Sequence, residues 1–246
     1  MKAMIFAAGM GTRLKPVTNY GPKALVEVND LPLIEHVIIK LKAAGITEII
    51  VNVHHFADQI IDFLKSRNNF EILMSISDET DQLLDTGGGL LKAKWFFDDN
   101  EPFIVYNTDI ISNIDLAELI QFHKNSNSIA TLAVKHRETS RYFLFNNQNL
   151  LCGWENKKTG EQKISRNEEN LVSFAFSGIQ VINPEIFELI TETGKFSITD
   201  LYLRLAKTHN ISGFQHNDSF WVDLGKLEDF KEAVRLINSA EKGEFL

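Results

Sequence analysis

A short segment near the start of the chain combines glycines with cationic side chains in a spacing that suits phosphate binding. The run Ala7-Ala8-Gly9-Met10-Gly11-Thr12-Arg13 directly follows an apolar stretch. Two glycines after a strand allow the backbone to turn tightly and to direct N–H groups at phosphate oxygens. Arg13 adds a planar, permanently charged fork, and Lys23 adds a point charge. The segment Ala7–Lys23 therefore predicts a site for a small polyanion.

The charge distribution supports this interpretation, although a solvated basic loop is the alternative. The chain carries a net charge of −8, yet no acidic residue precedes Glu27. An acidic protein with one cationic segment suits a small anion better than a nucleic acid or an anionic membrane surface. The segment is not a Walker loop, which needs Gly-Lys-Ser/Thr after four intervening residues. Leu14 stands where a dinucleotide fingerprint would have its third glycine.

Two further polar segments follow apolar runs that are typical of strands. They are Asn107-Thr108-Asp109 and Asp223-Leu224-Gly225. In open α/β sheets, ligands bind beyond the carboxyl ends of the strands, so these segments are expected to contribute to the same site. Taken alone, either aspartate is more often a turn former or a helix cap, and Asp223 before Gly225 is especially open to that interpretation.

The run Phe6–Thr18 and its continuation Pro22–Val28 resemble the signature of the sugar-1-phosphate nucleotidyltransferases. The resemblance covers nearly the full chain, through Thr86–Gly89, Asn107–Asp109, Ser177-Gly178 and Trp221–Gly225. Within that family, Thr86–Gly89 looks most like the run in N-acetylmuramate-1-phosphate uridylyltransferases. Mannose-1-phosphate guanylyltransferase-like proteins are the close alternative.

The resemblance implies partners, a cofactor and roles. The partners are a nucleoside triphosphate and a sugar 1-phosphate, which react by in-line attack on the α-phosphorus with release of pyrophosphate. Asp109 and Asp223 match the family's Mg²⁺ ligands, and Mg²⁺ typically takes one or two protein carboxylates. Arg13 and Lys23 match its catalytic cations. The implied nucleotide-binding residues are Ala8, Gly9, Gly11, Thr12, Arg13, Lys23, Gly87, Gly88 and Asn107, and the implied sugar-binding residues are Ser177, Gly178 and Ser197.

Several alternatives remain open at this point. The best match implies UTP with N-acetylmuramate 1-phosphate, and the alternatives are a mannose-1-phosphate guanylyltransferase, a phosphocholine acceptor, or a catalytically silent nucleotide-sugar sensor. Hexose-specific thymidylyltransferases have Glu in place of Ser197 and a glycine near Phe143, which argues against a plain glucose acceptor. Ser197 with Asp200 also fits a helix capping box. Gly178 equally fits a bulge, and Gly87-Gly88-Gly89 a flexible turn, although three glycines favour close ligand approach.

The elements that must position these residues alternate in the first half of the chain. Strands are predicted at 2–8, 48–53, 72–77 and 103–106, and helices at 33–44, 57–66, 90–97 and 116–123. From Ser128 strands dominate, at 129–135, 142–145, 150–154, 172–182, 211–215 and 220–222, with helices at 198–207 and 227–239. This order predicts an α/β fold with a Rossmann-like mixed, mostly parallel sheet flanked by helices, which the resemblance makes GT-A-like.

The whole chain, 1–246, is expected to form one nucleotidyltransferase domain with a nucleotide-binding half at 1–127 and a sugar-phosphate-binding half at 128–246. No apolar run approaches the roughly 18 residues that cross a bilayer. Cys152, the only cysteine, excludes an internal disulfide and indicates a buried structural thiol in a reducing, cytoplasmic protein. Neither a nucleic acid nor a membrane is expected as a partner. A homodimer is a possible assembly by family habit alone.

Overall fold

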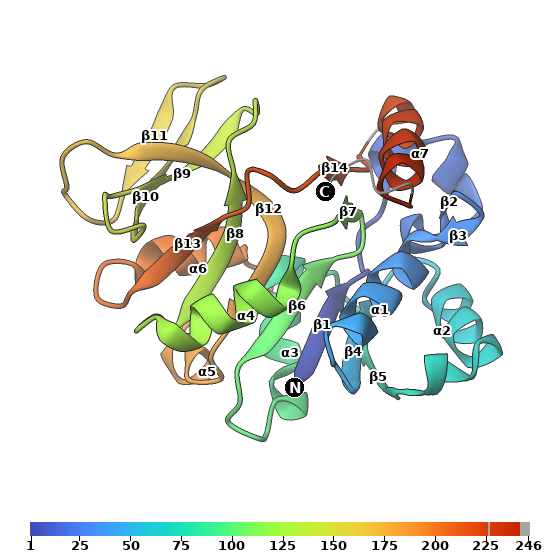
Figure 1. Cartoon of the computed structure of the whole chain (residues 1–246). Coiled ribbons are helices and arrows are strands. Elements are labelled where there is room, and N and C mark those ends of the chain that lie inside the picture. Colours follow the sequence, from blue (N-terminus) through green and yellow to red (C-terminus); the bar gives the residue numbers. More distant parts are fainter. Residues whose placement is uncertain (226, 242–246) are drawn as a thin grey trace. The chain divides into compact units, whose positions relative to one another are not determined.

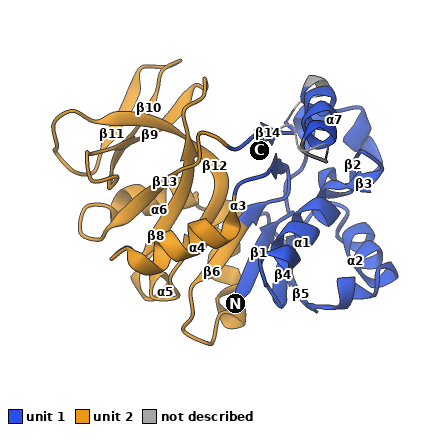
Figure 2. Ribbon diagram, in the orientation of Figure 1, with its two compact units in different colours: residues 1–83, 106–114, 219–246 blue, residues 84–105, 115–218 orange. Residues whose placement is uncertain are grey.

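The computed structural model describes residues 1–225 and 227–241. The chain forms two compact units, each assembled from segments that are far apart in the sequence (Figure 2). Unit 1 comprises Met1–Leu83, Tyr106–Ile114 and Ser219–Leu246, and unit 2 comprises Leu84–Val105 and Asp115–Asp218. Strand β6 (Phe103–Asn107) runs from unit 2 into unit 1 along the chain.

Unit 1 combines parallel strands with helices and several short 3₁₀ turns (Figure 1). Its strands are β1 (Lys2–Phe6), β2 (Glu27–Val28), β3 (Leu31–Pro32), β4 (Glu48–Val53), β5 (Leu73–Asp78), β7 (Ile110–Ser112) and β14 (Trp221–Asp223). Its helices are α1 (Leu33–Ala43), α2 (Ala57–Ser66) and α7 (Leu227–Glu241), with 3₁₀ turns at Thr12–Leu14, Val17–Asn19, Lys23–Leu25 and Asn68–Glu71.

Strands β1, β4 and β5 pair in parallel, with β4 between the other two. The central residues of β1 and β4 are fully buried, as expected for parallel strands that are covered on both faces. Helix α1 begins after Pro32 and ends just before Gly45, which has a left-handed φ of 79°. The start and the end of this helix therefore agree with the proline and glycine signals in the sequence.

An apolar cluster within unit 1 brings together residues of β2, α1, β7, β14 and α7. Strand β7 pairs antiparallel with β14, and Val222 and Ile111 pack in one core with Leu33 of α1. Helix α7 adds further apolar residues to the same cluster, and it lies next to β2 although the two are far apart in sequence (Figure 1). Asn29 Nδ2 donates to Asn238 Oδ1 at 3.1 Å. The C-terminal segment is thus an integral part of unit 1.

Unit 2 is rich in antiparallel strands. Its strands are β8 (Ala130–Lys135), β9 (Arg141–Phe145), β10 (Leu151–Asn156), β11 (Glu161–Ile164), β12 (Val172–Ile182) and β13 (Ile211–Gln215). Its helices are α3 (Asp85–Lys92), α4 (Leu116–Asn125), α5 (Ile186–Leu189) and α6 (Ile198–Leu205), with a 3₁₀ turn at Lys94–Phe96. Strands β9, β10 and β11 form an antiparallel series, and the long β12 pairs with β9 and then with β8.

The predicted α/β class with a Rossmann-like mixed sheet flanked by helices is confirmed. Parallel pairs are β1–β4 and β4–β5 in unit 1 and β8–β13 in unit 2. Antiparallel pairs include β7–β14 in unit 1 and the series of β8 to β12 in unit 2. One predicted boundary is wrong: the glycine run does not precede a helix at 90–97 but lies inside α3, which begins at Asp85. Close packing of this helix, described below, outweighs the weak helix propensity of glycine.

Candidate active site

The loop after β1 starts on a buried polar support. The backbone N–H groups of Ala7 and Ala8 donate to Asn52 Oδ1 at 2.7 and 3.3 Å. Asn52 Nδ2 in turn donates to Glu79 Oε1 at 2.7 Å, and both side chains are buried. Such a paired network fixes the direction in which the chain leaves the strand. This support is not among the features predicted from the sequence, although Asn52 within the apolar strand 48–53 was a signal for it.

Gly11 makes the turn that brings the loop back toward Lys23. Its φ of 59° is left-handed, and its carbonyl accepts from Thr18 Oγ1 at 2.8 Å and from Leu14 N at 2.9 Å. A Cβ at this position would lie 2.9 Å from Thr18 Cγ2 and 3.2 Å from Lys23 Cβ. Both conformation and space therefore require glycine here.

The exposed side of the loop has room for a ligand. Gly9, Met10, Thr12 and Arg13 are all exposed, in contrast to the buried Ala8 before them. A Cβ at Gly9 would meet no atom of unit 1 within 4 Å, so the protein's own packing does not require glycine there. An open backbone beside a cationic side chain agrees with the predicted approach of a phosphate group.

Lys23 and Asp109 form a close ion pair. Lys23 Nζ lies 2.5 Å from Asp109 Oδ2, and the two side chains are 12% and 26% exposed. Asp109 follows β6, whose end is fixed to β1 because Thr108 donates through its backbone N–H and its hydroxyl to the Phe6 carbonyl. The structure thus places the predicted metal ligand directly against the predicted catalytic lysine.

Asp223 lies on the strand next to Asp109. In the β7–β14 pair, Asp223 is in register with Ile110, and Leu224 N donates to the Asp109 carbonyl at 2.9 Å. Both segments rest on the apolar cluster that joins α1 and α7. The two aspartates are therefore brought together by paired strands on a shared apolar cluster, although they are far apart in sequence.

Arg13 lies against the segment that follows Asp223. A Cβ at Gly225 would lie between 2.9 and 3.1 Å from the Arg13 guanidinium atoms Nη1, Nη2 and Cζ. The guanidinium therefore packs on bare backbone, which only glycine allows. Arg13, Lys23, Asp109 and Asp223 all belong to unit 1, together with Asn107, the half-buried last residue of β6.

The donor set fits the Mg²⁺ ion that the resemblance implies. Two partly exposed carboxylates on adjacent segments match the one or two protein ligands that Mg²⁺ usually takes, the others being phosphate and water oxygens. Among residues 1–225 and 227–241 there is no cluster of three or more His, Cys, Asp or Glu side chains with metal-binding geometry. That Asp109 and Asp223 hold Mg²⁺ stays a prediction.

The glycines of α3 belong to unit 2, where they serve close packing. A Cβ at Gly87 would lie 2.4 Å from the Phe196 ring, and one at Gly88 would lie 2.3 Å from the Gly194 carbonyl oxygen. Gly87 N and Gly88 N also donate to the Phe196 carbonyl. The glycine run is thus not a flexible turn. Its predicted contact with a nucleotide base stays a prediction.

The three residues predicted to bind the sugar each have a structural task in unit 2. Ser177 is fully buried, and its Oγ lies 2.7 Å from His216 Nε2. Gly178 has a φ of 73° and lies in the register shift of β12 between Phe176 and Gln180. This position agrees with the alternative prediction of a β-bulge. Ser197 Oγ accepts from Thr199 N at 3.2 Å and caps α6. Their contact with a sugar stays a prediction.

Cys152 is a buried thiol, as predicted from the sequence. The thiol is free and fully buried, and burial raises its pKa above the usual range. His54 is equally structural, because its Nδ1 lies 2.6 Å from the Glu79 carbonyl beside the support of the phosphate loop. Neither residue has a place in the predicted chemistry. Within the described part of the chain, none of the helices is long and apolar enough to cross a membrane.

Comparison with known proteins shows the family to which the chain belongs. The family model described as nucleotidyl transferase matches residues 2–240. The chain is 32% identical over 246 residues to a mannose-1-phosphate guanyltransferase of Yarrowia lipolytica, with 98% of this chain and 65% of that protein covered. It is 30% identical to a UTP–glucose-1-phosphate uridylyltransferase of Synechocystis, with 98% of this chain and 64% of that protein covered. The chain thus spans less than two thirds of the length of these relatives.

Solved structures show the same fold. A putative glucose-1-phosphate thymidylyltransferase from Bacillus anthracis superposes with a TM-score of 0.79 at 23% identity, covering 96% of this chain and 94% of the other. A UDP-glucose pyrophosphorylase from Acinetobacter baumannii gives 0.78 at 20% identity, with 97% and 93% covered. The sequence match over residues 2–240 carries the assignment further than fold alone. The chain belongs to the nucleotidyl transferase family.

Proposed function

We propose that this protein transfers a nucleoside monophosphate from a nucleoside triphosphate to a sugar 1-phosphate. An oxygen of the sugar phosphate attacks the α-phosphorus, the bond to the β-phosphate oxygen breaks, and pyrophosphate leaves. The observation that carries this proposal is the assembly of Arg13, Lys23, Asp109 and Asp223 within unit 1. Family membership and the names of the relatives support it.

The residues of unit 1 account for the main obstacle, which is the approach of two anions. The acceptor phosphate is already ionised at neutral pH, so no general base is needed. Catalysis rests on positioning and charge neutralisation. Arg13 binds the oxygens of the departing pyrophosphate, and Lys23 binds the α-phosphate or the sugar phosphate. Asp109 and Asp223 hold Mg²⁺, which when bound neutralises phosphate charge.

The Lys23–Asp109 ion pair gives Lys23 a second task. Its ammonium balances Asp109 at 2.5 Å and holds the carboxylate in position. When phosphates enter, Lys23 turns its remaining N–H groups to them, since an ammonium has three donors. The same side chain thus serves the ligand-free and the ligand-bound site.

The relatives favour GTP and mannose 1-phosphate as the first pair to test. Three of them, from Yarrowia, Candida and rice, carry names of mannose-1-phosphate guanylyltransferases. UTP with N-acetylmuramate 1-phosphate, expected from the Thr86–Gly89 run, is the second pair. We place the nucleotide-binding role in residues 1–127 and the acceptor-binding role in residues 128–246 of one nucleotidyltransferase domain, in a cytoplasmic enzyme.

A screen of pyrophosphate release tests the proposal. The protein is incubated with MgCl₂ and each of four NTPs against mannose-, glucose-, N-acetylglucosamine- and N-acetylmuramate 1-phosphate. We expect turnover with at least one pair and none after addition of EDTA. If the protein binds a nucleotide but no pair gives turnover, the proposal of an enzyme is wrong, and a catalytically silent nucleotide-sugar sensor is the better interpretation.

A further inference from the structure

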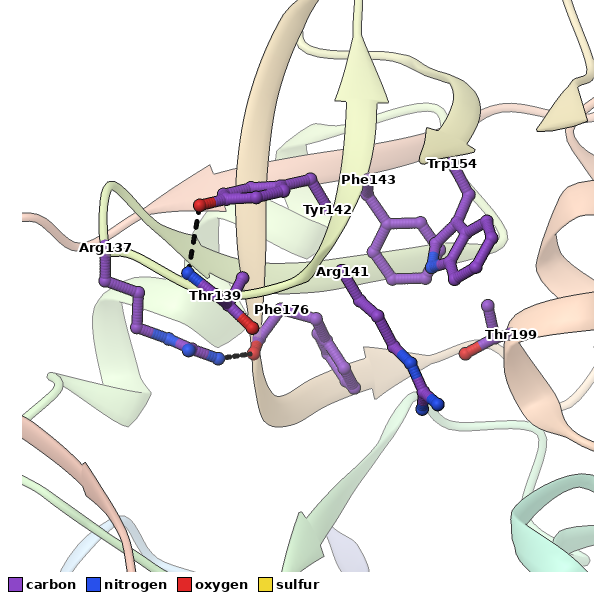
Figure 3. Close-up of a pocket in the computed structure, with 8 residues that line it drawn as sticks. All are labelled: Arg137, Thr139, Arg141, Tyr142, Phe143, Trp154, Phe176 and Thr199. Carbon is purple, nitrogen blue, oxygen red and sulfur yellow. Dashed lines mark hydrogen bonds between the residues drawn. The ribbon is translucent and has the colours of Figure 1, made fainter. Parts of the chain in front are cut away.

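Unit 2 contains a pocket of about 210 Å³ whose lining residues take no part in the site of unit 1 (Figure 3). This volume lies below the roughly 300–1,000 Å³ of pockets for drug-sized ligands, so the space suits a single sugar ring better than a nucleotide. Its lining includes Arg137, Arg141, Phe143, Trp154, Phe176 and Thr199.

The strand registers explain why aromatic rings and a cation share this pocket. Arg141 and Phe143 are two residues apart on β9 and therefore point to the same face of the sheet. Trp154 of β10 lies directly opposite Phe143, so its side chain is on that face as well. The Phe176 ring lies 5.9 Å from the Phe143 ring. The result is an aromatic wall with a guanidinium beside it (Figure 3).

The positive charge of Arg141 is not used by the protein itself. Among the described residues, its side chain has no hydrogen bond and no ion pair, and Arg141 is exposed. Carboxylates on neighbouring elements are engaged elsewhere: Asp200 of α6 binds Lys163 Nζ at 2.9 Å, and Glu155 of β10 accepts from Ser173 Oγ at 2.7 Å. An unneutralised guanidinium in a pocket is a receptor for a carboxylate or a phosphate.

The second arginine of the pocket is fixed and defines its shape. Arg137 Nη2 donates to the Phe176 carbonyl at 2.9 Å. Tyr142 is held in a similar way, because its hydroxyl accepts from Thr139 N at 2.9 Å. The walls are thus preformed, while Arg141 remains available to a ligand.

We infer that this pocket binds the sugar of the acceptor and selects a sugar 1-phosphate with an additional carboxylate. The sugar's C–H face packs on Trp154 and Phe143, and Arg141 binds the carboxylate through its two-pronged fork. This inference rests on the proposed function. It also differs from the relatives' names in the sugar that it favours. Those names favour the neutral sugar mannose, whereas the pocket favours an acidic sugar.

The test uses two acceptor pairs that differ only by an acidic group. One pair is N-acetylglucosamine and N-acetylmuramate 1-phosphate, and the other is glucose and glucuronate 1-phosphate. For each pair, the ratio of kcat/KM for the acidic over the neutral member is measured with wild type, Arg141→Gln and Arg141→Lys. Lys158→Ala is the matched control, since Lys158 is an exposed cation in the neighbouring β10–β11 turn.

We expect wild type to prefer the acidic member of at least one pair. Arg141→Gln lowers that ratio roughly 10- to 100-fold, as for loss of a hydrogen-bonded charge, and Arg141→Lys lowers it less. Lys158→Ala leaves it unchanged. A wild-type preference for the neutral member of both pairs would overturn the inference. An equal loss for both members in Arg141→Gln would also overturn it, because Arg141 would then bind the phosphate that they share.

Failure of the proposed function is distinguishable from failure of this inference. If no pair releases pyrophosphate, calorimetric binding of N-acetylmuramate and N-acetylglucosamine 1-phosphate in the absence of nucleotide decides. Tighter binding of the acidic ligand that is lost in Arg141→Gln supports the pocket even then. Equal affinity of wild type and Arg141→Gln for both ligands refutes it.

Discussion

At the scale of single residues, Asp109 and Asp223 have the most direct consequence. We expect Asp109→Asn and Asp223→Asn each to reduce pyrophosphate release on the order of 100-fold or more, since each removes a charge that faces the phosphates and the metal in the proposed site. The fold should persist, because both side chains are only partly buried. Circular dichroism checks the fold, and Asp58→Asn on the exposed face of α2 is the control. Full Mg²⁺-dependent turnover of either variant would remove that aspartate from the site.

Gly225 offers a test of Arg13 that leaves the arginine in the protein. In Gly225→Ala, the new Cβ would lie 2.9 Å from Arg13 Nη1 and would therefore displace the guanidinium. The long Arg13 side chain can move aside, so the fold should persist. We expect kcat/KM to fall roughly 10- to 100-fold, because misplacement of a positioning group is costly. Arg13→Ala should lose about 3 kcal/mol of transition-state stabilisation. If Gly225→Ala has wild-type kinetics while Arg13→Ala does not, the observed position of Arg13 is not its working position.

His123 makes the stability of unit 2 depend on pH. Its ring contacts Thr131 Oγ1 at 2.9 Å and Asn183 Oδ1 at 3.1 Å. Burial lowers its pKa, and the hydrogen bond with Asn183 opposes this shift. The folded protein therefore binds fewer protons than the unfolded chain once the pH falls below about 6.5. Stability is fully present above that pH and declines below it, by up to about 1.4 kcal/mol per pH unit.

The measurement for His123 is the urea midpoint of unfolding at pH 7.5 and pH 5.5. The decline on acidification should be smaller in His123→Gln than in wild type, because glutamine does not titrate. Both proteins share every other ionisable group, so the difference isolates this histidine. An equal decline would mean that His123 accepts a proton in the folded state as easily as in the unfolded chain.

At the scale of elements, the packing of α3 on the segment before α6 gives a clear prediction. In Gly88→Ala, the new methyl group would meet the Gly194 carbonyl oxygen at 2.3 Å, and backbone cannot move aside as a side chain can. We expect a loss of roughly 1–3 kcal/mol in unfolding free energy by urea denaturation. Gly87→Ala should be rescued in part by Phe196→Leu, since its obstacle is the Phe196 ring. Unchanged stability in Gly88→Ala would show that α3 shifts freely.

Elements with strong patterns could be predicted from the sequence, and those fixed by contacts could not. Strands β1 and β4 and helices α1 and α2 follow from their buried apolar patterns, and α1 also has clear end signals. Helix α3 was placed too late because its glycines oppose a helix locally and are needed only for packing against Phe196. Strand β11 was missed because all its residues are exposed and show no alternation.

The candidate site divides in the same way. Arg13, Lys23, Asp109 and Asp223 were predicted because motifs mark them, and the structure assembles all four within unit 1. The buried Asn52–Glu79 support was not predicted, because its hydrogen bonds join three separate strand ends. Gly225 had no assigned role, since its packing against Arg13 depends on the folded loop.

At the scale of the whole molecule, we expect the nucleotide and the sugar phosphate each to protect a different unit from hydrogen exchange. Nucleotide with MgCl₂ is expected to slow hydrogen exchange in residues 7–23, 106–112 and 221–225, all in unit 1. At 100 times its Kd, a ligand of the native state adds about 2.7 kcal/mol to stability. A mannose or N-acetylmuramate 1-phosphate should instead protect β9 and β10 of unit 2. Protection of β9 and β10 by nucleotide alone, with residues 7–23 unaffected, would contradict this division of roles.

Unit 1 is assembled from three segments of the sequence, Met1–Leu83, Tyr106–Ile114 and Ser219–Leu246, and their order has a consequence for synthesis on the ribosome. The phosphate-binding loop emerges early, but Asp223, Gly225 and the apolar cluster around α7 emerge only after nearly all of unit 2. At about 5–20 residues per second, roughly 10–40 s separate the synthesis of Arg13 from that of Asp223. During that interval the nascent chain holds an incomplete reaction centre. Unit 2 is therefore available to fold first, and the reaction centre is complete only once Asp223 and Gly225 have been synthesised.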